Sequence, residues 1–220
     1  MAMKKAFFAA AVALVLAGCS TTVAGSATWP GAMLAKQALG PADFPAGVQY
    51  SRIKENPGVP DGSGGPPSML SKPPGCANGL TNVIADSAER GPGSAVKYAV
   101  GYDGARILVT LLSWNLDLDK LRASAQRCAN FEAFFDPNAE GIPITTKGLT
   151  GLEPGALGYQ QTMRLRDASS SVYMAFQNIG HRGLFAVAFP IPNPMISAKA
   201  QLPQTFLDMF AQQAARIRTS

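Results

Sequence analysis

Two β-rich segments joined by the dipeptide Asp103-Gly104 place the strongest constraint on how this chain can fold. Residues 96–102 and 105–112 are dominated by Val, Ile, Leu, Ala and Tyr. Asp-Gly between two such segments favours a two-residue type I′ turn, which joins antiparallel strands. From Ile107 onward the second segment is apolar on both of its faces, as expected of a strand with neighbours on either side. The sequence therefore predicts an antiparallel hairpin inside a larger sheet.

Further strands are predicted on both sides of this hairpin. Residues 48–53 alternate in the manner of a strand, and residues 56–74 are so rich in Gly, Pro and Ser that they predict a long loop. Downstream, an antiparallel meander is predicted from three strands with turns between them: strands 156–165, 171–179 and 184–191, turns 167–170 and 180–183.

Three helices are predicted to pack on the sheet. The first covers residues 32–39, the second begins near Asp117 or Asp119, and the third covers residues 203–217. Helical spacing places four residues on one face of the second helix: Leu118, Leu121, Ala125 and Cys128. In the third helix, five residues lie on one stripe: Leu202, Phe206, Phe210, Ala214 and Ile217. The order of elements predicts an α+β fold: one antiparallel sheet with helices packed on it, in a single domain over residues 31–220.

The N-terminus carries a short apolar run preceded by two lysines. The run covers about 12 residues, too few to span a bilayer, and it ends at Leu16-Ala17-Gly18-Cys19. This ending resembles the bacterial lipobox, in which the cysteine is diacylated and the chain is cut just before it. The resemblance implies a lipoprotein signal peptide over 1–18, an acylated Cys19 (palmitate or a similar chain) and a flexible tether over 19–30. The alternative is an ordinary signal peptide in which Cys19 is incidental.

If Cys19 carries lipid, only Cys76 and Cys128 remain. In an exported protein disulfides persist, and a bridge across about 50 residues stabilises a fold by roughly 3–4 kcal/mol in the chain-entropy model. The sequence predicts such a bridge between the helix carrying Cys128 and a loop. Two buried free thiols or one reactive thiol are the alternatives.

Charge and motifs argue against several classes of function. The chain has 19 basic and 14 acidic residues and a formal charge of +5, without any run of Lys or Arg that would suggest nucleic-acid binding. The single histidine, His181, lies in a predicted tight turn, and no G-x-S-x-G motif accompanies it. No cysteine–histidine cluster suits zinc, and no cofactor motif is present. We therefore predict neither catalytic nor metal-binding residues.

Aromatic residues are the best candidates for ligand contacts. Alternation places Tyr98 and Tyr102 on the same face of the hairpin, and Trp114 follows the hairpin. If no helix covers that face, these three rings line a ligand cleft; otherwise they are core.

The elements together resemble a known family. Pro41-Ala-Asp-Phe-Pro-Ala-Gly47 ahead of a strand, Pro73-Pro-Gly-Cys-Ala77, the hairpin, the helix with Cys128 near its end and the closing amphipathic helix resemble exported mycobacterial and other actinobacterial lipoproteins. Their mature domain is similar to the extracellular sensor domain of a mycobacterial serine/threonine protein kinase. The resemblance covers roughly residues 30–217 and implies a Cys76–Cys128 disulfide and a concave ligand-binding surface. A second disulfide expected in the kinase domain has no cysteines here.

These observations predict a cell-surface lipoprotein, held by its N-terminal lipid at the outer face of the plasma membrane. Its domain is expected to be a non-catalytic sensor-like module for a lipid, glycan or peptide ligand, with no cofactor. The alternatives are an envelope hydrolase with an unrecognised active site and a scaffold that docks another envelope protein.

Overall fold

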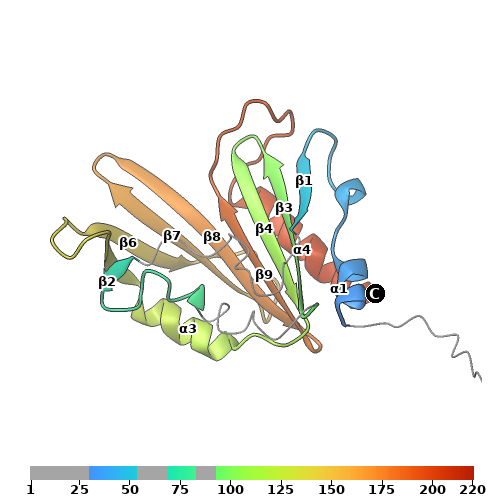
Figure 1. Cartoon of the computed structure of the whole chain (residues 1–220), viewed down its shortest axis with the longest axis horizontal. Helices are drawn as coiled ribbons and strands as arrows, with labels where there is room; N and C mark the ends of the chain where they lie inside the picture. The colour runs from blue at the N-terminus through green and yellow to red at the C-terminus, as the bar shows by residue number, and fades with distance from the viewer. Residues whose placement is uncertain (1–29, 54–68, 83–92) are drawn as a thin grey trace, which may run out of the picture.

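The computed structural model describes residues 30–53, 69–82 and 93–220, and within them nine strands form one antiparallel sheet accompanied by three α-helices (Figure 1). The strands are β1 Gln49–Ile53, β2 Leu70–Lys72, β3 Ala95–Tyr102, β4 Ala105–Leu112, β5 Asn130–Phe134, β6 Ile142–Gly148, β7 Leu157–Leu165, β8 Ala168–Ile179 and β9 Arg182–Phe189. The α-helices are α1 Pro30–Gln37, α3 Leu118–Arg127 and α4 Gln204–Thr219, and a short 3-10 helix, η1, covers Pro41–Asp43. The broad prediction of an antiparallel sheet with packed helices is confirmed.

The predicted hairpin forms the inner part of one half of the sheet. The strand order is β1-β3-β4-β9-β8-β7-β6-β5-β2, so β4 lies between β3 and β9 as its apolar sequence predicted. The turn at Asp103-Gly104 closes on the pair Tyr102↔Ala105, and Gly104 has φ +98°, a conformation that favours glycine. Asp103 does not have a positive φ, so the turn is not the predicted type I′, which requires positive φ at both central residues. The meander of β7, β8 and β9 is also confirmed, and β1 is left as one edge of the sheet.

One face of the sheet is sealed by α1 and α4. The buried cluster beneath them takes Leu34, Ala38 and Leu39 from α1 and its C-terminal end, Tyr98, Val100, Tyr102, Ile107, Val109 and Leu111 from the hairpin, and Phe206, Met209, Phe210, Ala214 and Ile217 from α4. Figure 1 shows α4 behind the sheet and α3 in front of it, at its lower end. We call the side beneath α1 and α4 the covered face.

The opposite side, which we call the open face, is only partly covered by the residues that the structure describes. Helix α3 contributes Leu121 and Ala125 to a second cluster, together with Trp114 and Leu116 from the segment after β4. The side chain of Asn178 fixes that segment, because it donates to Leu116 O (2.9 Å) and accepts from Leu116 N (2.8 Å). In the described part of the chain, this cover lies over the end of the sheet near the β8–β9 turn and not over the β3–β4 turn.

The disulfide predicted from the sequence is present. Cys76 and Cys128 are joined across a sequence separation of 52, and they link the loop after β2 to the C-terminal cap of α3. Asp117 caps the start of the same helix by accepting from Lys120 N at 2.9 Å. A cross-link over this length contributes roughly 4 kcal/mol in the chain-entropy model. The bridge therefore ties the short strand β2 and its loop to a helix that would otherwise meet them only through side-chain contacts.

Both predicted turns of the meander are wrong in extent. The first turn is confined to Arg166 and Asp167, and β8 begins at Ala168. The β7–β8 hairpin thus extends beyond the core, and exposed serines form the first part of β8. The second is confined to Gly180 and His181. Gly183 belongs to β9, where a Cβ would lie 2.7 Å from Trp114 O, so the glycine there permits close packing rather than a turn.

Three strands were not predicted. In β5, buried Phe131 and Ala133 alternate with exposed Asn130 and Glu132, so the period-two signal is present but short. In β6, Pro143 lowers the strand propensity. Residues 70–72 form β2 inside the segment 56–74 that was predicted to be a loop.

Some predictions fall on residues that the structure does not describe. They are the signal peptide, the tether up to residue 29 and residues 56–68 of the predicted loop.

A buried amide connects the helices of the covered face. Gln213 of α4 is fully buried, and its Oε1 accepts from Tyr98 Oη (2.8 Å) and Leu39 N (3.0 Å) while its Nε2 donates to Gln37 O (2.8 Å). Gln37 Oε1 in turn accepts from the Arg182 guanidinium. Gln213 thus joins α4 to β3 and to the end of α1 through three hydrogen bonds that use both the oxygen and the nitrogen of its amide.

We predict that Gln213→Leu lowers the free energy of unfolding by about 3 kcal/mol or more, because it strands three buried polar partners at once. Tyr98→Phe removes only one hydrogen bond and leaves Gln213 Oε1 bonded to Leu39 N, so its loss should be about 1 kcal/mol. Urea unfolding of both variants beside the parent chain measures the difference. Equal losses for the two variants would contradict this role of Gln213.

Candidate functional site

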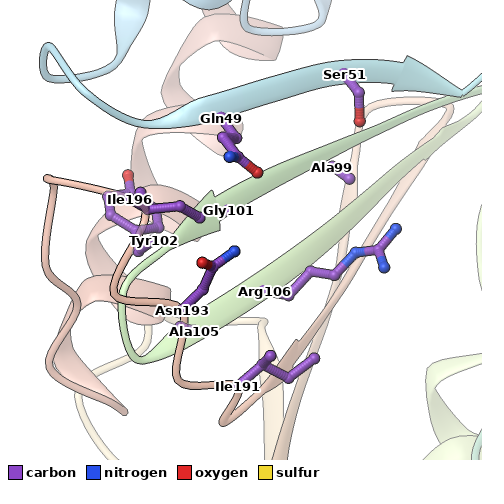
Figure 2. Close-up of a pocket in the computed structure, with 10 residues that line it drawn as sticks. All are labelled: Gln49, Ser51, Ala99, Gly101, Tyr102, Ala105, Arg106, Ile191, Asn193 and Ile196. Carbon is purple, nitrogen blue, oxygen red and sulfur yellow. The ribbon is translucent and has the colours of Figure 1, made fainter.

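A cavity of about 350 Å³ lies on the open face, at the edge formed by β1, β3 and β4. Figure 2 shows its lining: Gln49 and Ser51 from β1, Ala99, Gly101 and Tyr102 from β3, Ala105 and Arg106 from β4, and Ile191, Asn193 and Ile196 from the β9–α4 loop. Pairing brings the strand residues together, because Gln49 lies opposite Gly101, Ser51 opposite Ala99, and Gly101 opposite Arg106. We call this cavity the edge pocket.

The loop that forms one wall of the edge pocket is held by the β3–β4 turn. Asp103 N donates to Ala198 O (2.8 Å), Ala200 N donates to Asp103 O (2.8 Å), and Asp103 Oδ1 accepts from Asn193 N (3.0 Å). On its other side the loop packs against Gly47, where a Cβ would lie 2.0 Å from Ser197 Oγ. Asp103 was predicted only as a turn residue, yet it also positions this wall.

Gly101 leaves space at the floor of the pocket because it has no side chain. A Cβ on Gly101 would lie 3.3 Å from Ile196 Cδ1 and 3.5 Å from Gln49 Cβ, between the loop wall and the edge strand. With Ala99 as its neighbour on the same face of β3, the floor has almost no side-chain volume. The space therefore exists because β3 carries two small residues where a regular strand would carry large ones.

The polar lining has unused hydrogen-bonding capacity. Within the described residues no partner is recorded for the side chains of Gln49, Ser51 or Arg106, while Asn193 Oδ1 accepts from Met195 N (3.2 Å) and leaves its amide NH₂ available. Figure 2 shows Gln49 and Asn193 projecting into the space between β1 and the loop, with Arg106 beside them on β4. The lining residues include no carboxylate, so the guanidinium is the only formal charge among them.

The three aromatic residues predicted to bind ligand are not brought together. Tyr98 is fully buried on the covered face, where burial raises the pKa of its phenol well above the usual range. Trp114 is buried within the open-face cluster. Tyr102 alone lines the edge pocket, and burial also raises the pKa of its hydroxyl, which is therefore a protonated donor at neutral pH. Helices α1 and α4 cover the face that carries Tyr98 and Tyr102, so the alternative stated for a covered face, that the rings are core, holds for Tyr98.

The other residues considered for chemistry lie elsewhere. His181 is exposed in the β8–β9 turn, and the register Arg106↔Phe189 and Leu112↔Gly183 puts that turn at the opposite end of β9 from the edge pocket. Among residues 30–53, 69–82 and 93–220, no group of three His, Cys, Asp or Glu side chains is placed to hold a metal ion. In the same part of the chain, no helix is both long and apolar enough to cross a bilayer. Cys19 lies outside the described residues.

Sequence reasoning missed most of the edge pocket. Gly101 inside a strand was a usable signal, since an internal glycine often marks a close approach or an open space. Arg106 carried no signal by itself, because one arginine in an apolar strand also suits an exposed position. Asn193 and Ile196 come from a loop that is distant in sequence, and only the contacts of Asp103 bring them to the strands.

Comparisons with known proteins gave matches among solved structures. No protein-family model matches the chain, and no curated protein matches it in sequence. An uncharacterized protein from Mycobacterium smegmatis, the Rv0999 ortholog, aligns with 86% of this chain and 95% of its own length, at 14% identity and a TM-score of 0.45. The extracellular domain of PknH from Mycobacterium tuberculosis aligns with 84% of this chain and 92% of its own length, at 12% identity and a TM-score of 0.44. At these identities and scores, neither similarity assigns a residue, a ligand or an activity to this chain.

Proposed function

We propose that this chain is a non-catalytic ligand-binding module, anchored by lipid at the outer face of the plasma membrane. The edge pocket carries the proposal: within the described residues it is a space with unused donors, bordered by the strands β1, β3 and β4, the β3–β4 turn and the fixed β9–α4 loop. Pockets that bind small molecules combine an apolar lining with a few convergent polar groups, as this one does. Among the described residues that line the pocket, none is a carboxylate or a histidine that could serve Ser51 as a general base, and this supports binding rather than turnover.

The location rests on the N-terminal sequence and on the disulfide. Leu16-Ala17-Gly18-Cys19 after a short apolar run supports export and acylation at Cys19. The Cys76–Cys128 bridge supports an oxidising compartment, because disulfides are rare where glutathione keeps thiols reduced. Two or three acyl chains on the first mature residue would hold the domain stably at the membrane surface.

For the anchor, we predict that the full chain incorporates an alkyne-bearing palmitate during growth and that Cys19→Ser abolishes this label. The variant should also keep its leader, giving a band that is larger by about 18 residues, since lipobox processing requires the acylated cysteine. Labelling is read by fluorescence after click coupling and the leader by mass spectrometry. If Cys19→Ser loses the label but has the same size as the parent chain and stays in the membrane fraction, the lipid anchor is contradicted.

For the binding module, we predict that the full chain, released gently from envelopes and examined by native mass spectrometry, carries a bound envelope component. Gly101→Leu should remove that component, because the new side chain would fill the floor between Ile196 and Gln49. Gly148→Leu is the matched control: no atom lies within 4 Å of its added Cβ, and it lies on β6 rather than at the pocket.

Two outcomes would contradict this function. One is a parent chain that carries nothing and takes up nothing from envelope extracts. The other is equal occupancy in the parent chain and in Gly101→Leu, which would place the ligand elsewhere. Conversion of an added envelope fragment by the parent chain would favour an enzyme instead.

A further inference from the structure

The polar end of the edge pocket is suited to an anion. Arg106 has no recorded acidic partner within the described residues, and the groups around it can all donate hydrogen bonds: the amides of Gln49 and Asn193 and the hydroxyl of Ser51. Asp103 is the carboxylate of the adjacent turn, and its Oδ1 is already used by Asn193 N. A ligand oxyanion would satisfy donors that the protein itself leaves unmatched.

An apolar surface begins directly beside this polar end. Phe189 lies opposite Arg106 in the β4–β9 pairing, and Leu108 is the next residue on the same face of β4. Both are half-buried, and they continue into other half-buried side chains of the open face: Phe185, Val172, Tyr159 and Leu157. These side chains rest on the buried cluster beneath α3 but keep part of their own surface exposed. From β4 to β7 this apolar track crosses three strand spacings, or about 14 Å.

The wall of the pocket is apolar at its rim as well. Ile191 and Met195 belong to the fixed β9–α4 loop, and their side chains are 43% and 88% exposed. Single exposed apolar residues are common, but here two of them occur on the loop that borders the pocket beside Arg106. A ligand that enters past this rim would meet apolar surface before it meets the donors.

We infer that the edge pocket and the apolar track together bind an amphiphile with an anionic head, a phosphate or a carboxylate, and an acyl or alkyl chain. The head lies against Arg106, Gln49 and Asn193, and the chain follows Leu108 and Phe189 along the open face. This inference rests on the proposed binding function and adds the chemical class of the ligand. Charge complementarity selects the head group, and the half-exposed aromatic and aliphatic surface selects the chain.

The test uses the full chain in phosphatidylcholine nanodiscs and photoreactive diazirine analogues of dodecyl phosphate, dodecanoate and dodecanol, with empty nanodiscs as the partition control. Cross-linked peptides are mapped by mass spectrometry, and half-saturating concentrations are compared. The two anionic probes should label peptides of β4, β8 or β9 saturably, and Arg106→Gln should raise their half-saturating concentration about ten-fold or more. Arg164→Gln, the same charge change at an exposed position near the tip of β7, should change it by less than about two-fold.

Competitors separate the sources of the anion. Dodecyl phosphate should displace the photoprobe far better than inorganic phosphate or acetate; equal displacement would reduce the site to a plain anion site and overturn the inference. Equal labelling by dodecanol and the anionic probes, or no effect of Arg106→Gln, would overturn it too. If the parent chain carries a natural component that Gly101→Leu loses, but the anionic probes do not label the pocket, the proposed ligand class is wrong and the binding function stands. If no natural component is found and the probes do not label the pocket, both the ligand class and the binding function are wrong.

Discussion

The buried amide of Gln213 is the interaction on which the arrangement of this domain depends. A polar side chain in the middle of an apolar helix stripe is costly unless every bonding group finds a partner. Here the partners are Tyr98 of β3, Gln37 at the end of α1 and Leu39, which lies between α1 and η1. The result is a specific register between α4, α1 and the sheet, which apolar packing alone would define less sharply.

Sealing one face in this way has a consequence for the other. The chain has three α-helices in its described residues; two cover the same face, and the third covers only the end of the open face beside the β8–β9 turn. The opposite end of that face is bordered by the β9–α4 loop, which Asp103 fixes from the hairpin turn. The pocket therefore combines a wall that hydrogen bonds hold to the hairpin turn with a floor of Ala99 and Gly101, and larger side chains such as Ile191, Ile196 and Arg106 complete its lining.

The sequence was informative where a signal was local. Asp-Gly between two apolar segments predicted the hairpin, the helical spacing of Leu121, Ala125 and Cys128 predicted the buried face of α3, and the cysteine count predicted the bridge. It failed where a residue's role depends on distant contacts. Tyr98 reads as an aromatic candidate for ligand contact until α4 is placed over it, and Gln213 reads as an exposed polar residue until its three partners are known. Gly183 reads as a turn until Trp114 O is found against it.

The central claim is that the two faces of the β1–β3 edge differ: one is sealed by helices and the other is open to a ligand. Single cysteines at neighbouring positions test this directly, with the parent chain as the background for labelling. Ser51→Cys on the open face should react with a small maleimide within about ten-fold of the rate of a free thiol, because Ser51 is exposed. Val100→Cys, whose parent side chain is fully buried on the covered face, should react at least about a thousand-fold more slowly, since it requires unfolding. Similar rates at the two positions, or faster reaction at position 100, would contradict the account.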